Sequence, residues 1–198
     1  MIASRIEIKS FLSITSTSQD NLIDMLIPVI ESDVREYCNN GFRDDKVYVI
    51  SATINFTHNS TSADVIGIDD GFVDSGFLSG QTVQVQGSYN NDGFYDIESV
   101  SSTSLTLYSS TSRPYFDELV DEDEDLNVCI TKVNYPKALK LVVADMINFK
   151  LEKKDYSIQS ETVARYSVTF NSKGTDVSNG YPKALMSGLN RWKNVRFS

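Results

Sequence analysis

Few side chains in this sequence have types and spacings that could carry out chemistry. The single histidine, His58, has no second imidazole to join it in a catalytic triad or a multi-histidine metal site. Cys38 and Cys129 are far apart in sequence and form no CxxC pair, so neither a disulfide framework nor a zinc site is indicated. We interpret His58 as a surface residue and Cys38 as a small buried side chain on the apolar face of a helix.

The acidic run at residues 121–125 is the remaining candidate for cation binding. An EF-hand loop requires glycine at its sixth position and glutamate at its twelfth, and here Leu126 and Lys132 hold those positions. We interpret residues 117–125 as a solvated loop, with an adventitious cation as the alternative. Phosphate-loop, dinucleotide-binding and nucleophile-elbow motifs are missing from the sequence. We therefore predict no catalytic residues, no metal, no cofactor and no enzymatic activity.

The composition is that of a folded protein. The chain has 198 residues, of which 40% are apolar and 11% aromatic, and this is enough to bury a sizeable core. No apolar run approaches the ~18 residues of a membrane-spanning helix. Residues 1–7 alternate polar with apolar side chains and lack the core of a signal peptide. We expect a soluble protein from a reducing compartment, without a membrane segment.

Charge divides the chain into regions. Residues 44–130 carry sixteen acidic and two basic side chains, whereas residues 131–198 carry twelve basic and five acidic ones. An acidic segment does not bind nucleic acid by neutralising phosphates, because that requires clustered lysine and arginine. Such a segment repels DNA or keeps a crowded protein soluble. The basic C-terminal stretch suits an acidic or mixed partner surface.

Helical periodicity occurs near both ends of the chain. Residues 19–39 show apolar side chains at the spacing of an amphipathic helix, with Ser16 or Ser18 available as the N-cap and Gly41 as the left-handed C-terminal residue. A shorter helix is expected before it, at residues 9–14. Three further elements are predicted after residue 131: a helix at 136–153, a short strand around 166–170 and a last helix at 182–192.

Between residues 46 and 130, apolar side chains recur at every second residue, which is the period of a β-strand. Six short runs alternate there, separated by turn residues such as Asp92-Gly93, which favours a hairpin. Their spacing predicts a small antiparallel barrel or sandwich. We therefore predict an α+β protein in which a discontinuous bundle of three to four helices (residues 1–45 and 131–198) contains an inserted acidic β domain (residues 46–130).

The C-terminal tail is the most suggestive segment for function. It gathers the single tryptophan, a phenylalanine and three cations, which are typical anchors of protein interfaces. The alternative is that Trp192 covers the core of the bundle and the remainder frays. We predict an interface formed by Arg191, Trp192, Lys193, Val195, Arg196 and Phe197.

The order of the helical motifs carries a resemblance. The long helix ends in VREYCNNGF at residues 34–42. A helix rich in alanine, valine and methionine follows Tyr135-Pro136. The segment SETVARYSVTF at residues 160–170 then leads to Tyr181-Pro182 and a short helix. This arrangement, over residues 1–43 and 131–198, resembles head–tail connector (adaptor or head-completion) proteins of tailed double-stranded-DNA bacteriophages. Ala164-Arg165 stands where Gly-Asp is common in that family. Residues 46–130 lie outside its minimal pattern, although residues 71–83 are similar to small β modules of phage structural proteins.

The resemblance implies a structural role in the virion. Such adaptors form a ring, commonly of twelve identical subunits, beneath the portal protein and extend the DNA channel toward a stopper or tail-completion protein. Double-stranded DNA then passes through without sequence-specific binding. The C-terminal segment of the family commonly docks on the portal, and here that role falls on the tail residues at 191–197. The protein is expected at the head–tail interface of the virion, after assembly in the cytoplasm of the host bacterium.

Three other classes of function compete with this interpretation. A hydrolase would act through a pair of carboxylates, and substitution of one of them would abolish its turnover. A phage tail or baseplate interaction module would share the β domain but would not need a helical bundle with a basic tail. A carbohydrate-binding module would need exposed aromatic side chains on one β face, for which Tyr89, Phe94, Tyr95 and Tyr108 are the candidates.

Overall fold

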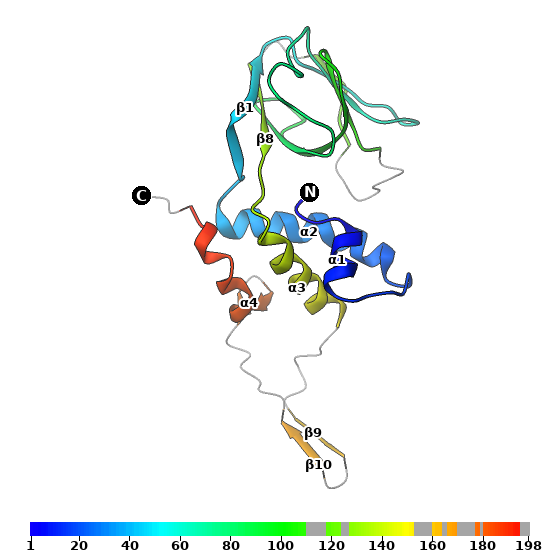
Figure 1. Cartoon of the computed structure of the whole chain (residues 1–198), viewed down its shortest axis with the longest axis vertical. Helices are drawn as coiled ribbons and strands as arrows, with labels where there is room; N and C mark the ends of the chain where they lie inside the picture. The colour runs from blue at the N-terminus through cyan, green and yellow to red at the C-terminus, as the bar shows by residue number, and fades with distance from the viewer. Residues whose placement is uncertain are drawn as a thin grey trace. The chain divides into compact units, whose positions relative to one another are not determined.

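The chain forms two compact units (Figure 1), which are described separately. The β unit consists of Met1 and Asn40–Pro136, and the helical unit consists of Ile2–Asn39 and Lys137–Ser198. A computed structural model describes residues 1–109, 118–123, 127–152, 160–163, 166–169, 177–178 and 180–194. These residues contain four α-helices and an eight-stranded antiparallel sheet, which confirms the predicted α+β class.

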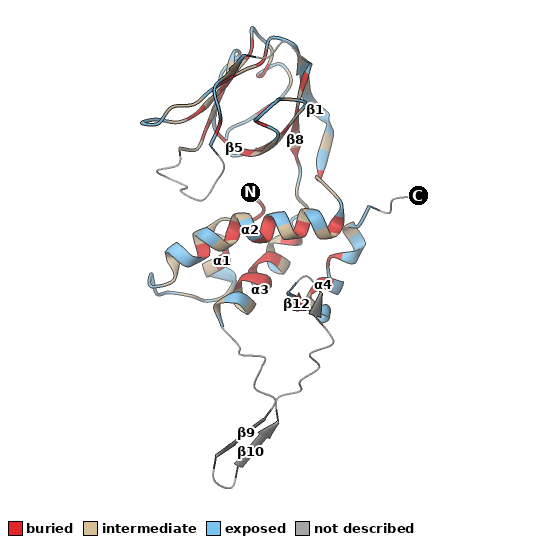
Figure 2. Ribbon diagram, turned by 180° about the vertical axis from the view of Figure 1, so that it is seen from behind, coloured by how far each residue is buried: buried red, intermediate tan, exposed pale blue. Residues whose placement is uncertain are grey.

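The long helix of the helical unit follows the predicted amphipathic pattern. Helix α2 (Asp20–Cys38) buries one apolar face, which consists of Ile23, Ile27, Ile30, Val34 and Cys38. The charged residue Glu31 is also buried on this helix. This spacing is that of a helix with one apolar stripe. The stripe packs mainly against α3 (Leu139–Leu151), and Figure 2 shows the buried parts of both helices.

The ends of α2 differ from the prediction. Its N-cap is Gln19, which makes no capping bond through its side chain, so neither Ser16 nor Ser18 caps it. At the other end Asn39, not Gly41, adopts the left-handed conformation, with φ 46° and ψ 44°. Asparagine tolerates this region because its short polar side chain can form local hydrogen bonds.

Helix α1 (Arg5–Phe11) begins four residues before the predicted short helix. A capping box sets its start: the Ser4 hydroxyl accepts a hydrogen bond from the Glu7 N–H (3.3 Å), and the Glu7 carboxylate accepts one from the Ser4 N–H (3.0 Å). Lys140 of α3 donates to the same carboxylate. Burial alone would raise the pKa of Glu7, but the hydrogen bonds from Lys140 and Ser4 outweigh it and hold the pKa below its ordinary value.

The last two helical elements are shorter than the predicted helix at residues 182–192. Helix α4 (Lys183–Ser187) is followed by a 3-10 turn, η1 (Asn190–Trp192). Two short strand pairs precede α4 in the chain. These are the hairpin of β9 (Ser160–Val163) and β10 (Tyr166–Thr169), and the pair of β11 (Val177–Ser178) and β12 (Tyr181–Pro182). The predicted strand at 166–170 is thus confirmed as β10, and Phe170 lies outside the described residues.

The β unit is built on one antiparallel sheet whose strands follow the order β1-β8-β4-β5-β6-β3-β2-β7. All six predicted runs lie in or next to strands, and the pair joined through Asp92-Gly93 is confirmed as β4 and β5. The bounds of the strands are β1 (Arg43–Ser51), β2 (Asn55–Thr57), β3 (Val65–Gly67), β4 (Thr82–Gln86), β5 (Gly93–Val100), β6 (Ser104–Leu107), β7 (Glu122–Asp123) and β8 (Val128–Val133).

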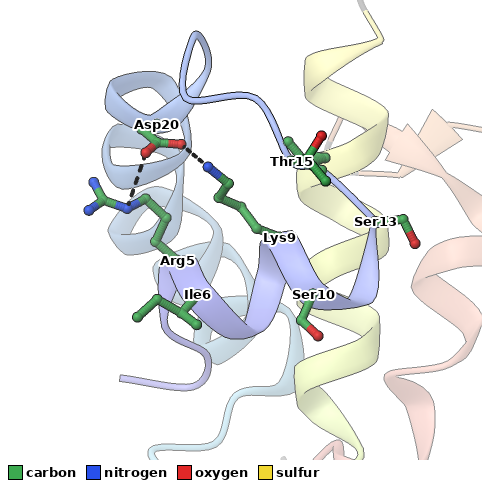
Figure 3. A pocket seen from close by; sticks show the side chains of 8 residues that line it. Arg5, Ile6, Lys9, Ser10, Ser13, Thr15 and Asp20 are labelled. Atoms are coloured by element: carbon green, nitrogen blue, oxygen red, sulfur yellow. Dashed lines mark hydrogen bonds and ion pairs between the residues drawn. The ribbon is translucent and has the colours of Figure 1, made fainter.

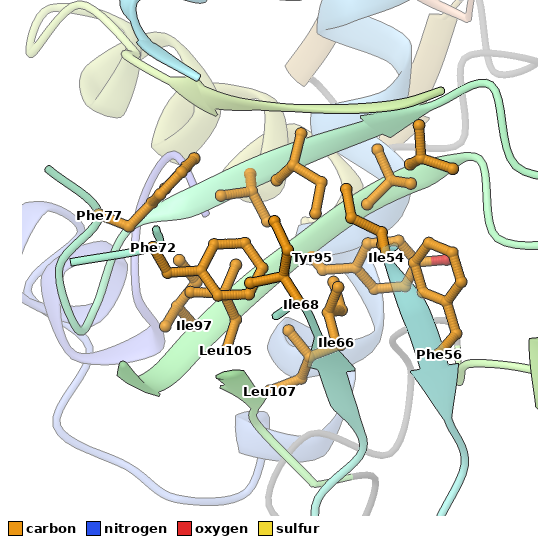
Figure 4. Close-up of a cluster of buried hydrophobic side chains, with 14 of the residues drawn as sticks. Ile54, Phe56, Ile66, Ile68, Phe72, Phe77, Tyr95, Ile97, Leu105 and Leu107 are labelled. Carbon is orange, nitrogen blue, oxygen red and sulfur yellow. The ribbon is translucent and has the colours of Figure 1, made fainter. Parts of the chain in front are cut away.

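The core of the β unit is a cluster of buried apolar side chains that lie among the strands of this sheet (Figure 4). Alternate residues of the strands point into it, as the period of two requires. A segment between β3 and β4 adds Phe72 and Phe77, whose rings meet edge to face at a centroid distance of 5.9 Å. Tyr95 is also buried here, and its hydroxyl donates a hydrogen bond to the Asn91 carbonyl (3.1 Å).

Candidate functional site

The end of the described chain lies against the C-terminus of α2, so the base of the predicted tail has a defined place in the helical unit. The amide N–H of Asn194 donates to the Cys38 carbonyl (2.9 Å). The Asn39 side-chain amide donates to the Asn194 carbonyl (3.4 Å). The last carbonyls of a helix have no partner within the helix, and Asn194 satisfies one of them here.

Tyr37 holds the same segment from the side. Its hydroxyl donates to Oδ1 of Asn190 (3.0 Å), and the Lys193 ammonium lies 3.6 Å from the centroid of its ring. A cation in this position also interacts favourably with the negative end of the α2 dipole. Tyr37 therefore contacts the segment at two points, three residues apart.

Cys38 provides a further contact to this segment. Its thiol is fully buried and lies 3.7 Å from the Leu189 carbonyl, to which it donates a weak hydrogen bond. Burial raises the pKa of this thiol, and the nearby Lys193 opposes the shift only in part. The prediction that Cys38 is a buried side chain on the apolar face of α2 is confirmed. We name the group Tyr37, Cys38 and Asn39 the helix-end clamp.

Tyr181 fixes the position of α4, which leads into the tail. Its buried hydroxyl donates to Oδ2 of Asp33 on α2 (2.9 Å). Its ring lies 5.9 Å from that of Phe149 and 4.5 Å from the Lys150 ammonium. Burial and the Asp33 carboxylate both raise the pKa of the phenol, so the hydroxyl remains a donor at neutral pH.

Three of the six predicted tail residues lie together just beyond this point. The Arg191 guanidinium is 3.9 Å from the centroid of the half-buried Trp192 ring, and Arg191 and Lys193 are exposed. The remaining three, Val195, Arg196 and Phe197, lie outside the described residues. Their assignment to a portal interface remains a prediction.

The clamp was missed by sequence reasoning, which treated residues 37–41 only as a helix end. Asn39 and Asn40 were signals of a turn, but nothing in their spacing identifies a partner more than 150 positions away. The available signal was the basic tail itself. Cations are favoured at helix C-termini, and the end of α2 is one of the helix C-termini that the chain offers.

A groove lies beside α1 in the helical unit (Figure 3). It encloses about 430 Å³ and is lined by residues of α1 and of the segment that leads to α2. Its two cations are already paired: Lys9 lies 2.5 Å from Asp20, and Arg5 pairs with Asp20 (3.9 Å) and Asp24. The groove therefore offers no uncompensated charge to a ligand.

Acidic residues of the β unit hold loops together. Asp64 accepts hydrogen bonds from the amides of Asn59 and Leu119, both at 2.8 Å, and its Oδ1 lies 3.0 Å from Nδ1 of His58. Glu122 accepts from the amides of Tyr89 (2.7 Å) and Asn90 (3.1 Å). His58, predicted at the surface, is half-buried. Within the described ranges, no group of three histidine, cysteine, aspartate or glutamate side chains is placed to hold a metal ion. Glu124 and Asp125 of the acidic run lie outside those ranges.

The aromatic candidates for carbohydrate binding do not share one exposed face. Tyr95 belongs to the core, with 6% of its surface exposed, because its register position on β5 points inward. Phe94 and Tyr108 are half-buried, and Tyr89 is 71% exposed. The expectation of an aromatic platform is therefore wrong for Tyr95.

A comparison with protein families supports the resemblance over the first half of the chain. Residues 6–97 match the family model described as phage gp6-like head-tail connector protein. The matched range differs from the expected one, because it continues through residues 46–97 and does not include residues 131–198. A search of curated proteins finds no match. None of the described helices is long and apolar enough to cross a membrane. The predicted resemblance is thus confirmed, and through residues 6–97 the chain has the sequence pattern of a phage head–tail connector protein.

Proposed function

We propose that this chain is a non-enzymatic structural protein of the virion that forms a ring adaptor beneath the portal. The ring joins the DNA-filled head to the neck and tail and extends the DNA channel. The observation that carries the proposal is the match to head–tail connectors, together with a basic aromatic tail held at the end of the helical unit. The partners are the portal, a stopper or tail-completion protein and identical subunits, commonly twelve.

The tail residues 191–197 are assigned to the portal contact. Trp192 and Arg191 form a stacked pair of the two residue types most enriched at interface hot spots. Lys193 adds charge beside them, and hydrogen bonds of Asn190 and Asn194 to the end of α2 position the segment. Such a preorganised anchor favours a stable contact with another protein surface.

The two units have separate roles in this proposal. The helical unit is a discontinuous bundle that forms the connector, and the β unit is an inserted antiparallel barrel-like domain. The sixteen acidic side chains of residues 44–130 repel DNA, so this unit favours passage of the duplex without binding. Assembly takes place in the host cytoplasm.

The first experiment measures mass by light scattering, for the chain alone and for the chain mixed with the purified portal ring of the same phage. We expect a stoichiometric ring on the portal, visible by electron microscopy. Truncation after Asn190 removes the predicted contact residues, and we expect it to abolish binding while circular dichroism stays unchanged. A truncated chain that binds as well as the full chain would exclude the tail as the portal contact.

A second experiment tests the alternative of a tail, baseplate or carbohydrate-binding module. The full chain is applied to an array of bacterial surface glycans, with and without Tyr89→Ala. We expect no retention by either protein. Retention that is lost on Tyr89→Ala would favour the carbohydrate-binding function over the connector.

A further inference from the structure

We propose that the helix-end clamp, Tyr37, Cys38 and Asn39, is a positioning device that fixes the direction in which the tail leaves the helical unit. This inference rests on the proposed portal contact and assigns the clamp a role within it. The clamp residues act on the tail and not on the portal itself. Their function is to hold residues 189–194 before the partner arrives.

The segment would not hold this position by itself. The 3-10 turn η1 has three residues and no side-chain cap, and short 3-10 turns have little stability of their own. Chain termini are ordered only when other groups tie them down. The order of residues 189–194 therefore depends on contacts with the rest of the unit.

The contacts fix both the position and the direction of the segment. The N–H of Asn194 donates to the Cys38 carbonyl and its carbonyl accepts from the Asn39 side chain, so both backbone polar groups of Asn194 are oriented by the end of α2. Tyr37 binds Asn190 one turn earlier in the same segment. Two fixed points four residues apart determine the line along which residues 190–194 run.

Asn39 is suited to this role by its backbone as well as by its side chain. Its left-handed conformation ends α2 and directs its amide toward the tail. Glycine adopts the same backbone conformation without strain but has no side chain. Asn39→Gly therefore removes the contact to the tail and keeps the helix end.

Preorganisation predicts the direction of the effect on binding. A tail that is already ordered loses less conformational freedom when it docks, so the clamp tightens binding without contacting the partner. Loss of one neutral hydrogen bond corresponds to a change of roughly 2–10-fold in an equilibrium constant. We expect Tyr37→Phe and Asn39→Gly each to weaken the affinity of the full chain for the portal ring by about fivefold.

The experiment measures the Kd for the portal ring by interferometry, for the full chain and these two variants. The matched control is Ser32→Ala, an exposed position on the same helix. The fluorescence anisotropy decay of Trp192, the single tryptophan, measures the local mobility of the tail. A change in global stability alone would leave this decay unchanged. We expect a faster component in both clamp variants, an unchanged decay in the control and unchanged melting midpoints.

The outcomes separate the clamp from the proposed function. If truncation after Asn190 leaves portal binding intact, the tail contact fails and the clamp has no role in it. If truncation abolishes binding while Tyr37→Phe and Asn39→Gly bind as tightly as the full chain, or more tightly, the clamp inference alone is overturned. Tighter binding would mean that the tail must leave the clamp before it docks.

Discussion

The hydroxyl of Tyr181, directly before α4, ties this part of the chain to α2. It is buried, and it donates to Asp33 at 2.9 Å. Tyr181→Phe keeps the ring but removes the donor, so we expect a loss of about 1 kcal/mol in the free energy of unfolding at pH 7. Urea unfolding monitored by circular dichroism measures the change, with the exposed Tyr48→Phe as control.

The same residue predicts a dependence on alkaline pH. Its pKa is raised in the folded state by burial and by Asp33, so above pH 10 the unfolded chain loses a proton that the folded chain retains. The stabilisation is complete below pH 10 and declines above it, by up to about 1.4 kcal/mol per pH unit from this residue. Tyr181→Phe lacks this decline. Plotted against pH, the free energies of unfolding of the unchanged chain and of Tyr181→Phe should therefore converge above pH 10. Parallel curves would contradict the assigned cause.

Residue types near the site were only partly predictable. Arg191, Trp192 and Lys193 were identified because tryptophan and arginine are typical of interfaces, and the structure does place them together. Tyr37 and Asn39 were not identified, since hydrogen bonds between residues over 150 positions apart leave no periodic pattern. Long-range polar pairing depends on the fold itself.

At the scale of elements, the capping box determines where α1 begins. Ser4 and Glu7 each satisfy an amide that the helix would otherwise leave unpaired. We expect Ser4→Ala to lower the free energy of unfolding by about 1 kcal/mol, because the N-cap bond is lost. Thermal unfolding followed at 222 nm measures this, and Ser10→Ala at an exposed position is the control. Equal effects of the two substitutions would show that the cap contributes nothing specific.

Elements with a regular period were predicted best. The apolar positions of α2 and the alternating residues of β4 and β5 follow from burial of one face, which local sequence records directly. The ends of elements were predicted less well. Asn39 ends α2 two residues before the predicted Gly41, because a polar residue adopts the left-handed conformation there. The register that buries Tyr95 depends on strand pairing and is not visible in composition.

At the scale of the whole molecule, the division into two compact units predicts two separable unfolding events. Phe72 is fully buried in the core of the β unit, so Phe72→Ala should cost about 3–5 kcal/mol there. Trp192 belongs to the helical unit and its fluorescence reports that unit alone. We expect calorimetry to show one lowered transition while the fluorescence midpoint stays unchanged.

The control for this prediction is Val73→Ala, which changes the neighbouring residue at a position that is 54% exposed. It should leave both midpoints in place. If Phe72→Ala lowers the calorimetric and fluorescence midpoints by the same amount, the chain unfolds as one cooperative body.

The carboxylates that hold the loops of the β unit divide its acidic residues into two kinds. Asp64 and Glu122 are committed to particular backbone amides, whereas Asp69 and Asp74 are exposed. Substitutions in these two groups of acidic residues therefore have different consequences for the unit. Exposed acidic residues can be exchanged as a lineage adapts its surface, but replacement of Asp64 or Glu122 would have to be accompanied by a new loop.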